Sequence, residues 1–137
     1  MQGYNVILLF NAPYDKLLMC LRKKEPYKGL SNLVGGKIEP NEDGLAAAYR
    51  ELYEETGVAQ NDVALTHFLT FTYPLSDCYV EAYAGKLNHE TEVSGEENDL
   101  FWSDLNRDFF DMTVFAGEGN IGHMLELVKL SEKELFG

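Results

Sequence analysis

Cysteine and histidine are scarce in this chain. Its two cysteines, Cys20 and Cys78, belong to no Cys-x-x-Cys pair, and two thiols cannot form the disulfide framework of a small secreted domain. We therefore expect both to be reduced thiols of the protein interior. The three histidines stand apart from one another in the sequence, and none is assigned a role.

Basic residues are also few. Lysine and arginine together number 11, against 23 aspartates and glutamates, so the formal net charge is −12. Proteins that bind nucleic-acid polymers usually carry a basic footprint, and anionic membranes attract basic segments, so we expect neither as a partner. An acidic protein can still bind a small phosphate ester when metal ions bridge the two.

Long apolar runs are missing as well. No run approaches the roughly 18–20 residues that span a bilayer, and no signal-peptide pattern is visible. The sequence therefore predicts a cytoplasmic protein. Hydrophobic residues make up 45% of it, and the length of 137 residues suits a single domain over residues 1–137 with its own core.

Short apolar or alternating segments predict strands, and longer amphipathic segments predict helices. Strands are expected at residues 4–10, 16–23, 63–73, 78–87 and 100–102. Helices are expected between residues 43 and 57 and at residues 123–136. Strands around a central helix, with another helix closing the chain, predict an α/β (α+β) fold with a mixed β-sheet sandwiched between α-helices.

Residues 36–58 are the stretch around which the rest is organised. Asn41 or Asp43 can cap a helix, and Gly57 can end it in the left-handed conformation. About three turns of good helix formers lie between them. One face of this helix, which we expect to be buried, carries Leu45, Ala48, Tyr49, Leu52 and Thr56.

A second face of the same helix carries Glu51, Glu54 and Glu55. Like charges one turn apart destabilise a bare helix, whereas clustered carboxylate oxygens suit hard divalent cations. Alone, such a face is typical of a solvated acidic helix. Its neighbours favour a metal site instead: Arg50 can hold the Glu54 carboxylate, and the glycines at 35–36 let backbone approach a ligand closely.

This stretch resembles the Nudix box of the Nudix hydrolases, Gly-x5-Glu-x7-Arg-Glu-U-x-Glu-Glu-x-Gly-U, in which U is a bulky aliphatic residue. Every defined position is filled, by Gly36, Glu42, Arg50, Glu51, Leu52, Glu54, Glu55, Gly57 and Val58. The resemblance implies the Nudix fold. It also implies hydrolysis of a nucleoside diphosphate linked to another group, in which water attacks phosphorus with the help of Mg²⁺, or of Mn²⁺ in its place.

Carried over by position, the three glutamates of the second face would be metal ligands, together with the carbonyl of Gly35. Arg50 would orient a glutamate with its planar guanidinium, which lysine could not reproduce. Candidate catalytic residues are therefore Arg50, Glu51 and Glu54, while the general base stays open among Glu51, Glu54 and a loop glutamate. The structural positions of the box would be Gly36, Glu42 and Gly57.

MutT-type relatives imply further site residues outside the box. A glutamate from the loop before the last strand would reach the metal, and here Glu96 and Glu97 both qualify, with the spacing to Trp102 slightly favouring Glu96. Arg22 would contact substrate, with a solvated strand end as the alternative. Asn120 would recognise the base, with capping of the closing helix as its alternative.

The favoured function is a metal-dependent nucleoside triphosphate pyrophosphohydrolase, with 8-oxo-dGTP as a candidate substrate and monophosphate and pyrophosphate as products. ADP-ribose, other nucleotide sugars and dinucleoside polyphosphates stay open, because the box fixes the reaction centre and not the leaving group. A non-catalytic nucleotide-sensing module is a second class, which the complete set of glutamates disfavours. The expected partner is a small-molecule nucleotide, and the protein is expected to be a monomer or homodimer.

Overall fold

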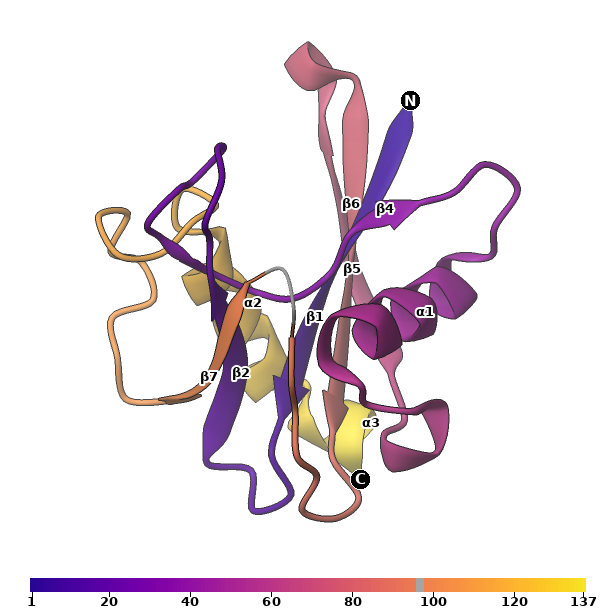
Figure 1. The fold of residues 1–137 in the computed structure, drawn as a ribbon, viewed down its shortest axis with the longest axis vertical. Coiled ribbons are helices and arrows are strands. Elements are labelled where there is room, and N and C mark those ends of the chain that lie inside the picture. The colour runs from indigo at the N-terminus through magenta and orange to yellow at the C-terminus, as the bar shows by residue number, and fades with distance from the viewer. Residues whose placement is uncertain (96–97) are drawn as a thin grey trace.

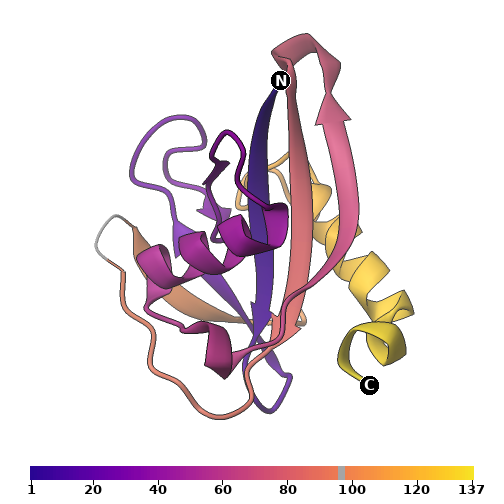
Figure 2. The same ribbon diagram turned by 90° about the vertical axis from the view of Figure 1, so that its right-hand side faces the viewer.

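The computed structural model describes residues 1–95 and 98–137 and places a mixed sheet between helices (Figures 1 and 2). The strands are β1 (Gln2–Phe10), β2 (Lys16–Leu21), β3 (Ser31–Asn32), β4 (Lys37–Ile38), β5 (Thr66–Tyr73), β6 (Cys78–Lys86) and β7 (Asp99–Asp104). The helices are α1 (Gly44–Thr56), α2 (Asn120–Leu130) and α3 (Glu132–Phe136), with short 3₁₀ turns η1 (Gln60–Asp62) and η2 (Pro74–Ser76).

Strand β1 lies at the centre of the sheet. The strand order over the described residues is β3-β2-β1-β6-β5, with β4 also paired to β1 and β7 paired to β2. Strands β1 and β6 run parallel, with Gln2 opposite Cys78 and Phe10 opposite Lys86, whereas the other pairs are antiparallel. A parallel pair needs a crossover connection, and helix α1 lies in it.

Both faces of β1 are covered, which explains why its sequence is a continuous apolar run and not an alternating one. Ile7 and Leu9 pack in the layer beneath α1, while Leu8 and Phe10 pack in the layer beneath α2. Figure 2 shows α1 on one side of the sheet and α2 with α3 on the other. The predicted fold class is therefore confirmed.

The closing helix differs from its prediction. It begins three residues earlier than expected, at Asn120, and breaks at Ser131 into α2 and α3. Leu130 is consequently 82% exposed, while Leu135 on α3 packs against the core. After the break, Leu135 and Phe136 of α3 pack against the core.

Cys20 is buried and Cys78 is half-buried, and both are free thiols. Burial raises the pKa of Cys20 to about 11, with the charge of Glu55 as a smaller cause.

In the part of the chain that the structure describes, no helix combines the length and apolar character needed to cross a membrane.

Candidate active site

Helix α1 has the ends that its sequence predicts. Asp43 is its N-cap, since the Asp43 carboxylate accepts a hydrogen bond from the backbone N–H of Ala46 at 3.1 Å. Gly57 ends the helix with φ of 80°, in the left-handed region. Asn41, the other candidate cap, lies in the preceding turn. The helix that carries the glutamates is therefore fixed at both ends by local interactions.

The buried face of α1 is rotated toward the glutamates relative to the prediction. Leu45 is 41% exposed, so its expected burial is wrong, while Ala47 is completely buried. Ala48, Leu52 and Thr56 are buried as expected. This rotation carries Glu51 inward, and its side chain is only 14% exposed.

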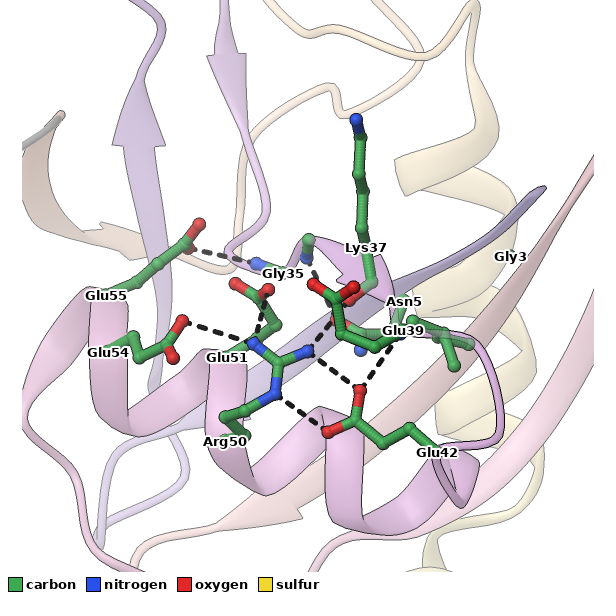
Figure 3. Close-up of polar contacts among 12 residues, drawn as sticks. Gly3, Asn5, Gly35, Lys37, Glu39, Glu42, Arg50, Glu51, Glu54 and Glu55 are labelled. Atoms are coloured by element: carbon green, nitrogen blue, oxygen red, sulfur yellow. Dashed lines mark hydrogen bonds and ion pairs between the residues drawn. The ribbon is translucent and has the colours of Figure 1, made fainter.

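Arg50 is the centre of a hydrogen-bond network that joins the helix to the preceding loop (Figure 3). Its Nε and Nη2 donate to the two carboxylate oxygens of Glu42 at 2.7 and 2.9 Å. Nη1 donates to Glu51 at 3.0 Å and to Glu54 at 3.2 Å, and Nη2 also donates to the Lys37 carbonyl at 3.0 Å. One guanidinium thus holds three glutamates of the box and the Lys37 carbonyl, as a planar fork can.

The pKa values of Glu42 and Glu51 are shifted in opposite directions. Hydrogen bonds from Arg50 hold the pKa of Glu42 well below its usual range. Burial raises the pKa of Glu51, although the hydrogen bond and positive charge of Arg50 oppose that change. Glu42 is thereby committed to Arg50, in agreement with a structural role, whereas Glu51 is a partly desolvated carboxylate at the edge of a cavity.

The turn at Gly35 and Gly36 lies directly against the glutamate face. The Gly35 N–H donates to Glu55 Oε2 at 3.0 Å. A Cβ atom on Gly36 would overlap the Glu51 carboxylate, so only glycine lets that side chain approach the turn. Gly35 has φ of 147°, and a Cβ there would overlap the carbonyl oxygen of Asn5.

A groove made of two adjoining cavities runs from this turn across the sheet. The first cavity, of about 590 Å³, contains all three glutamates of the second face, and we call it the carboxylate end. The second, of about 680 Å³, contains Tyr4, Tyr27, Tyr73 and Asn120, and we call it the tyrosine end. Both are lined by Cys20, Arg22, Gly35, Gly36, Lys37, Glu55 and Asn98.

Asn120 lies at the tyrosine end and does not cap its helix. The N-cap of α2 is Gly119, which has no side chain to offer, and Asn120 is the first helical residue. Asn120 Nδ2 donates to the Tyr73 hydroxyl at 2.6 Å. The capping alternative is therefore wrong, and the amide is positioned by β5 at the wall of the cavity.

A second pair of side chains bridges two loops near the tyrosine end. The Tyr27 hydroxyl donates to the Glu118 carboxylate, at 2.9 Å from either oxygen. Burial and this carboxylate raise the pKa of Tyr27 to about 12, so the phenol stays protonated. The loop after β2 and the loop before α2 are thus joined beside the cavity.

Arg22 follows directly after β2 and lines both cavities, where its Nε donates to the Pro26 carbonyl at 3.3 Å. The sequence did not single out Lys37, Tyr73 or Asn5, which also line the groove. Lys37 directly follows Gly36 of the box, and this position could have identified it as a candidate site residue. Tyr73 and Asn5 sit inside predicted strands, where nothing local distinguishes them from core residues.

The predicted metal ligands share one cavity but do not converge. Within residues 1–95 and 98–137, no three His, Cys, Asp or Glu side chains form a ready cluster for a metal ion. Glu51 and Glu54 each take a hydrogen bond from Arg50, and Glu55 takes one from Gly35. The donor set, three carboxylates and a backbone carbonyl, is nevertheless the oxygen set that Mg²⁺ or Mn²⁺ binds, so the residues fit such an ion.

Glu96 and Glu97 lie outside the described residues, so their assignment stays a prediction.

Comparisons with known proteins agree with this geometry. The NUDIX domain family model matches residues 1–116. A MutT/nudix family protein from Enterococcus faecalis is 26% identical with a TM-score of 0.64, over 77% of this chain and 44% of that one, so the chain spans less than half of that protein. No curated protein matches the sequence.

Two solved structures share the fold over nearly the whole chain. An Ap4A hydrolase from C. elegans has a TM-score of 0.76 at 18% identity, covering 98% of this chain and 99% of its own. The NUDIX domain of NrtR from Shewanella oneidensis, complexed with ADP ribose, has a TM-score of 0.71 at 18% identity, covering 93% and 85%. Family model, box and fold together place this chain in the Nudix family, whose members are hydrolases of nucleoside diphosphates linked to another group and generally use divalent metals.

Proposed function

We propose that this Nudix hydrolase is a Mg²⁺-dependent nucleoside triphosphate pyrophosphohydrolase that releases a nucleoside monophosphate and pyrophosphate, with Mn²⁺ as a possible substitute ion. The observation that carries the proposal is the continuous groove. Carboxylates that suit a divalent ion lie at one end, and hydroxyl and amide groups that suit a nucleobase lie at the other. Residues of both signs line the passage between them.

At the carboxylate end, Glu51, Glu54, Glu55 and the Gly35 carbonyl would hold the ion. A bound divalent ion neutralises phosphate charge and lowers the pKa of a water molecule. Arg50 Nη1 donates hydrogen bonds to both Glu51 and Glu54, which restrains the orientation of the two carboxylates. Because Arg50 is already saturated by its acceptors, its role is to orient the glutamates and not to bind phosphate directly.

Two cationic side chains offset the acidity of the passage. Arg22 and Lys37 line both cavities, and a triphosphate that extends from the carboxylate end would pass them. Guanidinium and ammonium groups are the usual partners of phosphate oxygens. Together with a bound divalent ion, these two side chains would let a chain of net charge −12 hold a polyanion without a basic surface.

At the tyrosine end, the Asn120 amide and the Tyr73 hydroxyl form one hydrogen-bonded unit at the cavity wall. An amide offers both a donor and an acceptor side, which matches a purine edge, and Phe71 and Tyr27 add apolar surface for a ring. A purine nucleotide is therefore the preferred substrate class, with 8-oxo-dGTP as the first candidate to test.

The proposal is tested by a product-resolved screen with Mg²⁺. Nucleoside triphosphates, 8-oxo-dGTP, ADP-ribose and a dinucleoside tetraphosphate are incubated with the enzyme, and products are separated by chromatography. Monophosphate plus pyrophosphate from a triphosphate supports the proposal. Preferential cleavage of ADP-ribose or the dinucleotide would replace it with those substrate classes, and nucleotide binding without turnover would indicate a sensor.

Metal removal is the second half of the same test. EDTA should abolish hydrolysis, and Mg²⁺ or Mn²⁺ added in excess of the chelator should restore it, because the acidic groove cannot hold a pyrophosphate without cations. Full activity in the presence of the chelator would contradict the metal assignment. Size-exclusion chromatography with light scattering would decide between monomer and homodimer.

A further inference from the structure

Asn5 is a polar residue in a position that the fold would fill with an aliphatic side chain. It lies on β1 and is 2% exposed, on the same side of the strand as the fully buried Ile7 and Leu9. Of the buried side-chain nitrogen and oxygen atoms in the described part of the chain, Asn5 Nδ2 alone has no hydrogen-bond partner. A buried donor without an acceptor costs free energy, so this amide needs a reason to be there.

The oxygen of the same amide supplies that reason. Asn5 Oδ1 accepts a hydrogen bond from the Gly36 N–H at 3.0 Å, and the Asn5 N–H donates to the Gly36 carbonyl at 2.8 Å. The Gly36 donor also fixes which end of the amide is oxygen, since an N–H can only meet an acceptor. Figure 3 shows Asn5 beside the Gly35 turn, behind the glutamates.

The Gly36 N–H and the Gly35 carbonyl belong to one peptide unit. In a planar trans peptide these two groups point in opposite directions. A hydrogen bond that holds the N–H against Asn5 therefore directs the Gly35 carbonyl away from the Asn5 side chain. Between two glycines the peptide has no side chain to resist rotation, so an external restraint has the most to contribute here.

We propose that Asn5 is a positioning residue that sets the direction of the Gly35 carbonyl and so prepares the cation site. The inference rests on the proposed function, in which that carbonyl is a metal ligand. It adds a residue outside the Nudix box, and it explains why a costly amide occupies β1. The unpaired Nδ2 is the cost of keeping Oδ1 in place, because an aliphatic residue would leave the Gly36 N–H without its acceptor.

The test measures Mn²⁺ binding directly, by electron paramagnetic resonance of the free ion, alongside kcat and KM. Asn5→Leu keeps the approximate size of the side chain and removes the acceptor. Its Kd for Mn²⁺ should rise about 10–100-fold, as for other residues that support metal ligands, while much of the loss in kcat is recovered at saturating Mn²⁺. Asn5→Asp retains an oxygen for Gly36 in either protonation state, so its Kd should stay near that of the wild type.

Ile7→Val is the matched control, since it weakens the same face of the same strand and leaves the Asn5 hydrogen bonds to Gly36 in place. Its melting temperature should fall while its Kd for Mn²⁺ stays unchanged. If Asn5→Leu fails to fold, the comparison of Asn5→Asp and Asn5→Ala by the same measurement replaces it, with Ala expected to lose affinity.

Two outcomes overturn the inference. One is a wild-type protein that binds Mn²⁺ and hydrolyses nucleotides while Asn5→Leu binds the ion equally well, which leaves the proposed function intact. The other is an Ile7→Val control that loses as much affinity as Asn5→Leu, which would reduce the effect to stability. A wild type that neither binds Mn²⁺ nor hydrolyses any nucleotide would instead refute the proposed function, and this inference with it.

Discussion

The carboxylate end and the tyrosine end of the groove differ in how the chain assembles them. At the carboxylate end the acidic side chains come from one helix, α1, and the loop just before it, and Arg50 alone connects Glu42, Glu51 and Glu54. The tyrosine end combines strand β1, the loop after β2, strand β5 and the start of α2. The carboxylate end is a local structure that one short sequence motif encodes. The tyrosine end exists only once the whole sheet has formed.

Under the proposed function, this difference separates the residues of catalysis from those of specificity. A local, tightly hydrogen-bonded unit suits the invariant chemistry of pyrophosphate cleavage. A surface gathered from four segments that are distant in sequence can change one residue at a time without disturbing that unit, which would let one fold serve many substrates. Substitutions at the two ends should therefore fail in different ways.

The largest expected effect is at the carboxylate end. Glu55→Gln keeps the size of the side chain and removes a predicted ligand charge, and kcat should fall at least about a hundredfold, which is about 2.7 kcal/mol in barrier. The fold should survive, because relieving clustered like charge does not destabilise a helix. The matched control is Glu126→Gln on the exposed face of α2, which should be fully active. Unchanged turnover in folded Glu55→Gln would remove Glu55 from the site.

A somewhat smaller effect is expected from Arg50→Lys. Lysine cannot reproduce the fork that binds Glu42 with two hydrogen bonds while also holding Glu51 and Glu54, so kcat should fall about 10–100-fold. Steady-state kinetics and a thermal melt measure it. Glu42→Gln, which disturbs only the structural half of the network, should lose less activity. Equal losses would mean that the loop contact, and not the orientation of the glutamates, matters most.

At the tyrosine end, Asn120→Ala should change selectivity more than rate. Losing the amide should raise KM about tenfold for the preferred purine nucleotide, about 1.4 kcal/mol, and flatten the preference among bases. kcat on poor substrates should persist, since the carboxylate end is untouched. Measuring kcat/KM for four nucleotides checks this, with Asn88→Ala on the far surface as control. An unchanged ranking of substrates would show that Asn120 only braces Tyr73.

The smallest effect is expected at the end of α1. Gly57 has φ of 80° and open space around its Cα, so Gly57→Ala meets no clash and pays only the backbone cost, about 1–2 kcal/mol of stability. Denaturant unfolding measures this cost. Because Glu55 and Arg50 lie inside the helix, kcat should stay within error of the wild type. A large loss of kcat would show that the box helix unwinds as a unit.

The sequence predicted the fold class, and it predicted the ends of α1 and the Arg50–Glu54 contact because these depend on local signals. The cap at Asp43, the left-handed Gly57 and the Arg50–Glu54 contact follow from residues within one or two turns of each other. The burial of Leu45 was wrongly predicted, because the glycine turn lets the helix sit with its glutamate side inward. A helical wheel describes the faces of one helix and contains no information about the glycine turn that packs against it.

The tyrosine end was only partly predictable for the same reason. Asn120 was identified through the family resemblance, but its partner Tyr73 is 47 residues away in sequence and joins it only in the folded protein. Asn5 gave no sequence signal at all, since one asparagine in an apolar strand is not a motif. Such residues become visible only when hydrogen bonds are counted in three dimensions.

The parallel pairing of β1 with β6 also limits the order in which the fold can form. Gln2 pairs with Cys78 and Phe10 pairs with Lys86, so β1 lacks its β6 neighbour until the polypeptide has grown well past the glutamates. Contacts so distant in sequence form slowly, because a long loop must close first. A nascent chain released before β6 would thus contain every box residue and still lack the sheet that holds Asn5 and the glycine turn in register.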